Sequence, residues 1–286
     1  MDGRAFLESL RPLSRSAQES AILAAVQAGS YIEPEFAQVS AKAGGHQVDL
    51  GVMTDTFKIG TTNPVRISAS ATLSQQIADS LGLLLPTMKI FDLSWQQAAK
   101  KLQPALQPYD FTGRHAAGLD KAPYFSPAMD DVGATLKYHD DVEHAAGGAS
   151  GLVMHGKIWA MSPSNTDSHV VNFGFYHGGS NATPYQTKGT AHSKEHRDYS
   201  QVLRLVHPAA LLDGQPTTVL ALLADPMLAG LISNEGPITS PRIPGVSPVP
   251  RGPAGAAAVG VALLAVMAFL GLGAGFLAGM HLLART

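Results

Sequence analysis

The stretch that decides the fold is residues 46–67, which reads HQVDLGVMTDTFKIGTTNPVRI. Apolar side chains alternate along its first part, as at Val48 and Leu50, and the turn formers Asn63 and Pro64 stand near its end. Alternation with a period of two, bounded by turn residues, is typical of a half-buried β-hairpin or meander. We therefore expect this stretch to supply the first strands of a sheet.

Helical spacing follows this stretch along the chain. Leu73, Ile77 and Leu81 share one face of a helix predicted over residues 70–83, and Gly82 stands near its C-cap. Further elements are expected as helices over 89–102 and 132–144 and as strands over 152–158, 169–176 and 200–206. Helices that flank strands without strict alternation indicate the α+β class, here a small antiparallel sheet with flanking helices.

The chain also divides into regions of different composition. Residues 1–45 are predicted to form a helical N-terminal arm, in which Ser16 and Glu19 have the spacing of a capping box. The α+β globular domain is expected over residues 46–233. Residues 234–253 read NEGPITSPRIPGVSPVPRGP, and this density of proline excludes a helix interior or a central strand. We interpret that segment as a semi-extended linker able to hold the domain some tens of ångströms from a membrane.

A transmembrane helix is predicted over residues 254–284. Residues 254–283 read AGAAAVGVALLAVMAFLGLGAGFLAGMHLL, with no Asp, Glu, Lys or Arg. About 20 apolar residues cross the hydrocarbon core of a bilayer as a helix. Gly271, Gly275 and Gly279 stand four residues apart and share one face, a small-residue pattern that brings membrane helices together. The predicted partners are therefore the lipid bilayer and other copies of the same span.

The ends of the chain indicate how the protein is inserted. Arg4 and Arg11 are not followed by the apolar run of a signal peptide, so we expect a single-pass protein with a C-terminal anchor. Arg242 and Arg251 precede the span, which favours a cytoplasmic position for the domain. The expected location is a host inner membrane, or the internal membrane or envelope of a virion.

Composition excludes several classes of function. The net charge is −2, so no basic surplus indicates nucleic-acid binding. The absence of cysteine removes disulfides, thiolate nucleophiles and cysteine-ligated zinc. Charged residues make up 15% of the chain, against about 25% in typical globular proteins. That deficit fits a chain with a membrane segment.

Four pieces of sequence carry a resemblance: LPT at residues 85–87, HGK at 155–157, FYH at 175–177 and TAHSKEHRDYSQVLRLV at 190–206. In this order they resemble a family of uncharacterised bacterial proteins with a His-x-x-x-Tyr-x-Asp-Tyr-Ser-His-Gly-Ile-Arg-Leu-Val type motif, over about residues 46–206. The chain departs from the family pattern at His196, where Tyr is usual, and at Gln201, where His is usual. Ile158 stands next to Lys157, where the family has a second lysine followed by an aspartate. The resemblance implies no reaction, and if the family is catalytic these losses count against activity here.

The candidate catalytic residues gather around the end of this motif. Asp198 and Ser200 precede an apolar strand, and strand ends hold side chains rigidly enough to build a site. Ser200 is a candidate nucleophile if a histidine such as His192 accepts its proton and Asp198 orients that histidine. A structural hydrogen-bond cluster that closes the sheet is the alternative.

Neighbouring predicted strands add His155, Lys157 and His177 to this set. Lys157 is the candidate for binding an anionic substrate or stabilising an oxyanion. We expect no organic cofactor. A zinc site made by His192, His196 and Asp198 is a further alternative, as is a polar turn with solvated histidines.

The sequence leaves two functions from different classes open. The first is a C-terminally membrane-anchored structural or interaction protein, such as a virion or envelope membrane protein with an oligomerising span. The second is a membrane-tethered, hydrolase-like domain acting on a polymer such as peptidoglycan. A tail-anchored effector or toxin domain is a third. Whether the protein is an enzyme stays open at this point.

Overall fold

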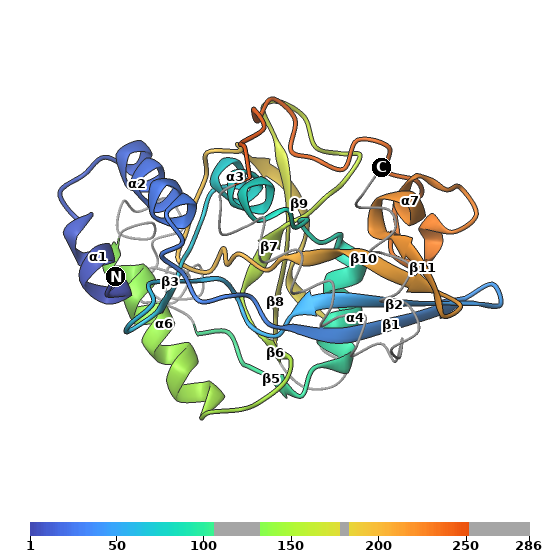
Figure 1. The fold of residues 1–286 in the computed structure, drawn as a ribbon, viewed down its shortest axis with the longest axis horizontal. Coiled ribbons are helices and arrows are strands. Elements are labelled where there is room, and N and C mark those ends of the chain that lie inside the picture. The colour runs from blue at the N-terminus through green and yellow to red at the C-terminus, as the bar shows by residue number, and fades with distance from the viewer. Residues whose placement is uncertain (106–131, 178–182, 252–286) are drawn as a thin grey trace, which may run out of the picture.

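This computed structural model describes residues 1–105, 132–177 and 183–251. A four-stranded antiparallel sheet lies on one side of the body, as Figure 1 shows. Its strand order is β1-β2-β10-β11. The strands are β1 (Phe36–Ala43), β2 (His46–Met53), β10 (Val206–Leu212) and β11 (Gln215–Thr218). Val48, Leu50 and Val52 on β2 have no exposed surface. Asp49, Gly51 and Met53 on the opposite face are buried as well, so this part of the strand is covered on both faces and not half-buried as its alternation suggests.

A second antiparallel sheet has three strands in the order β7-β8-β9 and lies in the middle of the molecule in the view of Figure 1. Its strands are β7 (Lys157–Trp159), β8 (Val170–Tyr176) and β9 (Pro184–His192). Two short pairs complete the strands: antiparallel β3 (Lys58–Ile59) with β4 (Val65–Arg66), and parallel β5 (Lys100–Lys101) with β6 (Val153–Met154).

Helices flank these sheets, as Figure 1 shows. They are α1 (Gly3–Ser9), α2 (Arg15–Gln27), α3 (Ala71–Leu81), α4 (Met88–Gln97), α6 (Val132–Ala146), α7 (Val219–Ala224) and the 3₁₀ turn η2 (Ala229–Leu231). Trp95 on α4 is 2% exposed and stacks on Tyr176 of β8, which joins the helix to the three-stranded sheet. The structure therefore confirms the α+β class with a small antiparallel sheet and flanking helices.

The segment expected as a helical arm differs from the prediction in two ways. Residues 36–43 form β1, which pairs with β2 along its whole length from Phe36↔Met53 to Ala43↔His46. Its inward side chains include the small Ala37 and Ala41, which give a weak hydrophobic signal. The cap of α2 is Ser14, whose side chain accepts from the backbone N–H of Ala17, and Ser16 lies inside the helix.

The strand predicted over residues 200–206 is also different. Only isolated bridges occur there, Ser68↔Val202, Leu84↔Val206 and Lys157↔Gln201, and the regular strand β10 begins at Val206. The apolar run is buried because three separate segments pack around it. These residues are continuously buried but have no regular partner strand. A continuous apolar run is also what a buried strand shows, which explains why the sequence resembles a strand at this position.

The proline-rich segment does not extend freely from the body. As far as its last described residue, it packs against the body. Ile238 and Ile243 are at most 2% exposed, and the guanidinium of Arg242 forms two contacts with the carboxylate of Asp79 on α3. The predicted transmembrane helix over residues 254–284 lies outside the described residues. Among the described residues, no helix is both long and apolar enough to span a bilayer.

Candidate functional site

Five of the candidate residues come together beside β7. We call this group the Asp198 cluster, and its members are Lys157, His192, His196, Asp198 and Ser200. Lys157 Nζ lies 2.6 Å from Asp198 Oδ2, with 13% and 5% of the two side chains exposed. The loop that carries Asp198 is held against β7 by two backbone hydrogen bonds, from Lys157 N to Ser200 O and from Val202 N to Lys157 O.

The carboxylate of Asp198 is the electrostatic centre of this cluster. Burial alone would raise its pKa, but the charge of Lys157 and the contacts from His196 and Ser200 hold the pKa well below its usual range. Asp198 is therefore ionised at neutral pH and paired with Lys157. Breaking a buried pair of this kind by removing one partner leaves an uncompensated charge, which is costly.

Ser200 is hydrogen-bonded to the same carboxylate through its hydroxyl and its backbone N–H. Its hydroxyl donates to Asp198 Oδ1 at 2.7 Å, and its backbone N–H donates to the same oxygen at 2.8 Å. Gln201 Oε1 accepts from the backbone N–H of Asp198. A serine hydroxyl that donates to a carboxylate closes a turn, whereas a nucleophilic serine donates to a general base. The geometry thus supports a structural role for Ser200.

The two histidines of the cluster stack on one another. The ring centroids of His192 and His196 are 4.0 Å apart with planes 9° from parallel, and Trp159 meets both rings edge-on. Imidazole lone pairs lie in the ring plane, so the nitrogens of parallel rings do not converge on one ion. Among the described residues, no group of three potential ligands is placed to hold a metal ion. The zinc site suggested by the sequence is therefore not formed in the part of the chain that the structure describes.

The charge state of His192 follows from its surroundings. Burial, His196 and Lys157 lower its pKa to about 4, so the ring is neutral at pH 7. His196 Nε2 approaches Asp198 Oδ2 at 3.8 Å, which makes His196 the histidine in ion-pair range of that carboxylate.

His177 and His155 lie apart from the Asp198 cluster. His177 is exposed at the end of β8, with its ring 4.9 Å from that of Tyr185. His155 is separated from Lys157 by Gly156, whose φ of +67° turns the chain between them. Lys157 contacts Asp198, whereas His155 contacts Asp55. Neither His155 nor His177 therefore joins the Asp198 cluster.

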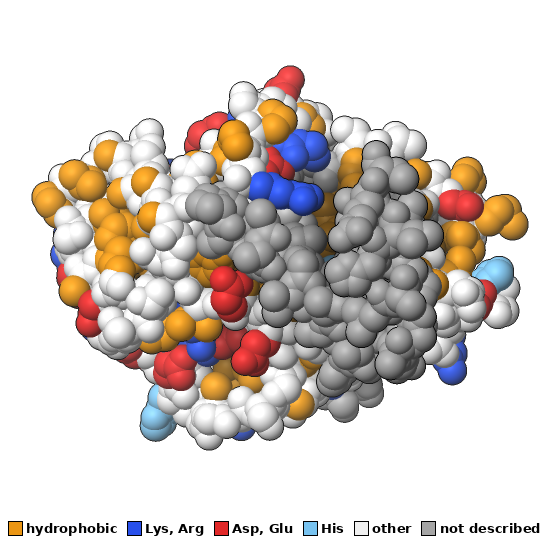
Figure 2. All heavy atoms as spheres, in the orientation of Figure 1, with side chains coloured by type: hydrophobic (Ala, Val, Ile, Leu, Met, Phe, Trp, Pro, Cys, Tyr) orange, Lys and Arg blue, Asp and Glu red, His pale blue; other side chains and the backbone are white. Residues whose placement is uncertain are grey.

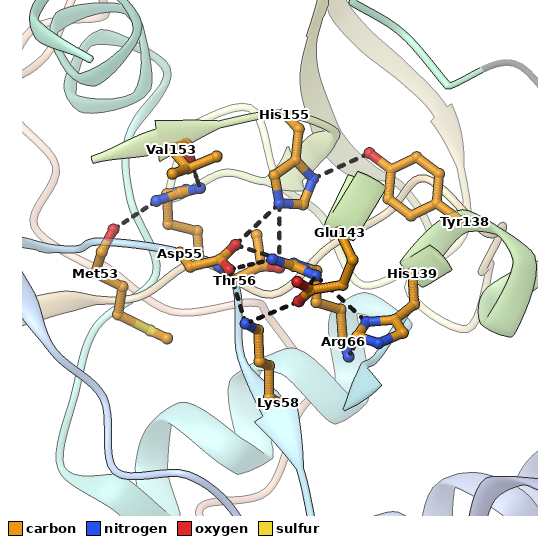
Figure 3. A network of polar contacts seen from close by, with 11 residues as sticks. Met53, Asp55, Thr56, Lys58, Arg66, Tyr138, His139, Glu143, Val153 and His155 are labelled. Carbon is orange, nitrogen blue, oxygen red and sulfur yellow. Dashed lines mark hydrogen bonds and ion pairs between the residues drawn. The ribbon is translucent and has the colours of Figure 1, made fainter. Parts of the chain in front are cut away.

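His155 belongs to a second group that the sequence did not predict, shown in Figure 3. We call it the Asp55 network; its members are Asp55, Lys58, Arg66, Tyr138, His139, Glu143 and His155. His155 Nε2 lies 3.1 Å from Asp55 Oδ1, and its Nδ1 lies 3.1 Å from the hydroxyl of Tyr138.

The direction of these hydrogen bonds can be assigned. Burial lowers the pKa of His155 to about 4 and raises the pKa of Tyr138, so both groups are neutral at pH 7. An ionised Asp55 only accepts, so His155 Nε2–H donates to Asp55 and Tyr138 O–H donates to Nδ1. A carboxylate, an imidazole and a hydroxyl are thus joined in the same direction as in a catalytic triad.

Two cations balance the carboxylates of the Asp55 network. Arg66 is 3% exposed and bridges Asp55 and Glu143, with 2.6 Å from its Nη1 to Glu143 Oε1. Lys58 Nζ lies 3.1 Å from Asp55 and 3.3 Å from Glu143. Although burial alone would raise the pKa of Asp55, the contacts with His155 and Arg66 hold that pKa well below its usual range. Because His155 is neutral at pH 7, the positive charges beside Asp55 are those of Arg66 and Lys58.

A buried arginine holds the two sides of this network together. Arg204 is 1% exposed and donates to the backbone carbonyls of Met53 and Val153, the latter at 2.6 Å. Each of these carbonyls stands two residues before a member of the network, Asp55 and His155. Arg204 therefore fixes the distance between the segments that carry the carboxylate and the imidazole.

The sequence contains a signal for the buried arginines Arg66 and Arg204, which our sequence prediction missed. Arg66 lies between Val65 and Ile67, and Arg204 lies between Leu203 and Leu205. A charged residue with apolar neighbours on both sides is buried only when it is paired or hydrogen-bonded. Such arginines indicate buried partners elsewhere in the chain, although the sequence does not identify those partners.

Comparisons with known proteins identify no relative of this chain. No family model, no curated protein and no solved structure matches the chain.

Proposed function

We propose that this protein is a membrane-anchored structural or interaction protein whose body is held at a bilayer by residues 254–284. The uncharged run of those residues supports the anchor. The observation that carries the choice of a non-enzymatic function is the pairing inside the Asp198 cluster. Its candidate acid, cation and hydroxyl contact one another, with Lys157 and Ser200 both bound to Asp198.

The test of this proposal is membrane extraction. The full chain is expected to stay with membranes in alkaline carbonate, which removes proteins held only by surface contacts. A shortened chain that ends after Arg251 is the matched control and should appear in the supernatant. It keeps Ile238, Ile243 and Val246, which are buried against the body. Release of the full chain by carbonate would refute the anchor.

A hydrolase-like activity is a second candidate, and the Asp55 network is the observation that favours it. The Tyr138–His155–Asp55 chain has the hydrogen-bond direction of an acid–base relay. A separate open hollow of about 620 Å³ is lined by Ser164, Thr166, His169, Lys188 and Thr190, none of which belongs to the Asp55 network, and its Lys188 is paired with Glu235. Hydroxyls and one ammonium group suit a polyhydroxylated polymer better than a lipid.

Turnover of peptidoglycan by the full chain would favour this second candidate. If the relay acts in catalysis, Asp55→Asn is expected to abolish turnover, because an amide can donate to the imidazole and no longer fixes its tautomer. Asp198→Asn serves as the comparison, since it removes a buried charge outside the Asp55 network. The absence of turnover by the unaltered chain would exclude the candidate for that substrate.

A further inference from the structure

The tether between the body and the proposed anchor is short. The sequence predicts that residues 234–253 hold the domain at a distance, but the backbone N–H of Val249 lies 3.4 Å from Asp79 Oδ2 on α3. Arg242 is bound to the same carboxylate. Five residue steps separate Val249 from Ala254, the first residue of the uncharged run, and they span at most about 17 Å. A body held this way cannot stand tens of ångströms from the bilayer.

The packed segment before the tether joins the short helix α7 to α3, where its last contact with the body is made. The backbone N–H of Ile238 donates to Leu223 O of α7 at 2.8 Å, and that of Ile243 donates to Gln75 Oε1 of α3 at 3.0 Å. Five residue steps join Ile238 to Ile243, so these contacts on α7 and α3 lie within about 20 Å of each other. Figure 1 shows this orange-to-red segment running from α7 to α3 along one side of the molecule.

The outward face of α7 and the following turn is apolar. Leu220 is 40% exposed and Met227 is 89% exposed. Leu222 and Leu223 are at most 1% exposed, so the helix cannot rotate to bury Leu220 without exposing them. Figure 2 shows hydrophobic side chains gathered on this part of the surface, beside the α7 end of the molecule. An exposed methionine and leucine close to a membrane tether are suited to contact with lipid.

The only ionisable residue between Thr217 and Gly230 does not oppose such contact. It is Asp225, whose carboxylate accepts from the backbone N–H groups of Met227 at 2.7 Å and Leu228 at 3.3 Å. Lys89 donates to Gly230 O at the border of this face. An ammonium group at that border fits the anionic headgroups that surround an apolar contact.

We infer that the body of the protein rests on the bilayer in which it is anchored, with Leu220 and Met227 at the boundary between headgroups and acyl chains. The inference depends on the proposed anchor, because the tether limits distance only if residues 254–284 lie in the membrane. The occupant of the α7 face is thus a lipid surface, and the same bilayer supplies it.

Site-directed labelling tests this contact in the full chain. The protein contains no cysteine, so Met227→Cys and Ala145→Cys each provide one labelling site. Ala145 is exposed near the end of α6. In Figure 1 the helix α6 lies on the side of the molecule away from the segment that joins α7 to α3. Each variant is labelled with an environment-sensitive fluorophore and reconstituted in vesicles of phosphatidylcholine and phosphatidylglycerol that contain a lipid with a nitroxide quencher in its acyl chain.

The label at position 227 is expected to be quenched several-fold more than the label at 145. Equal quenching in vesicles that carry the floated protein would overturn the inference and leave the anchor standing. A disulfide between two copies of the Met227→Cys variant, without quenching, would assign the face to a second copy and also overturn it. Failure of the protein to float with vesicles would refute the anchor, and the inference with it.

Discussion

A single glycine determines which charged groups meet in this protein. Gly156 has a φ of +67°, and a Cβ at this position would lie 2.7 Å from Val202 Cγ2 and 3.0 Å from Ser200 O. Only glycine allows both the turn and the close approach. Because of that turn, His155 joins the Asp55 network while Lys157 joins the Asp198 cluster.

Gly156→Ala is expected to destabilise the body by about 2–4 kcal/mol, from the strained backbone and the steric contact with Val202 together. Gly148→Ala is the matched control, because Gly148 has a φ of +73° with no atom within 4 Å of the added Cβ. Chemical denaturation of both variants measures the difference. If the two variants lost the same free energy of unfolding, the close approach of residue 156 to Val202 would not contribute to stability.

Acid is expected to destabilise the protein in the range where buried histidines take up protons. The pKa values of His139, His155 and His192 are each lowered to about 4, in each case first by burial. An unfolded histidine titrates near pH 6.5, so between about pH 6.5 and 4 the unfolded chain binds more protons than the folded one. Stability is therefore full above that range and falls as the pH is lowered through it.

The melting temperature of the full chain in detergent micelles, followed from pH 7.5 to 4, measures this effect. Below about pH 4 the loss should continue, because the pKa values of Asp55 and Asp198 are also depressed in the folded state. A constant melting temperature between pH 6.5 and 4.5 would contradict the neutral, buried state of the three imidazoles.

At the scale of elements, helices and the β2 strand were predictable and several pairings were not. Local signals define α3, with Ser70 as its N-cap and Gly82 in the left-handed conformation after its end. β1 was missed because its alanines give little contrast between faces. The Asp198 cluster was largely predictable, since His192, His196, Asp198 and Ser200 lie in one motif, and Lys157 is the member that comes from elsewhere in the chain. The Asp55 network was not, because it joins residues about 100 positions apart.

One carboxylate of α2 binds the residue that caps α3. Glu19 of α2 accepts from the backbone N–H and the hydroxyl of Ser70, at 3.0 and 2.7 Å, and Ser70 in turn caps α3. Glu19→Gln is expected to cost about 1–2 kcal/mol of stability, because it weakens two charge-assisted hydrogen bonds. The measurement is the free energy of unfolding from denaturant titration.

Glu8→Gln is the control for this change. Glu8 forms an exposed pair with Arg11 one turn away, and such pairs contribute at most about 0.5 kcal/mol. If Glu19→Gln were as mild as Glu8→Gln, the contact between α2 and α3 would not be a source of stability.

At the scale of the whole molecule, the short tether would couple the body closely to the proposed span. The packed segment up to Val249 leaves about 17 Å to the uncharged run, so association of spans would bring neighbouring bodies close together at the membrane surface. In this arrangement the body would act as part of an assembly and its contacts with neighbours would depend on the span. The glycine face of residues 271–279 is then the feature on which assembly depends.

Gly275→Ile is therefore expected to weaken self-association of the span. A branched side chain at the centre of the glycine face would keep two helix backbones from the close approach that stabilises membrane dimers without a hydrophobic driving force. A bilayer reporter assay of span association measures the loss, with Leu272→Ile as a control that adds no bulk to the Gly271–Gly275–Gly279 face. The signal should fall for Gly275→Ile and stay unchanged for the control. An equal signal for both variants would show that the small residues do not mediate association, and that any oligomer forms through the body.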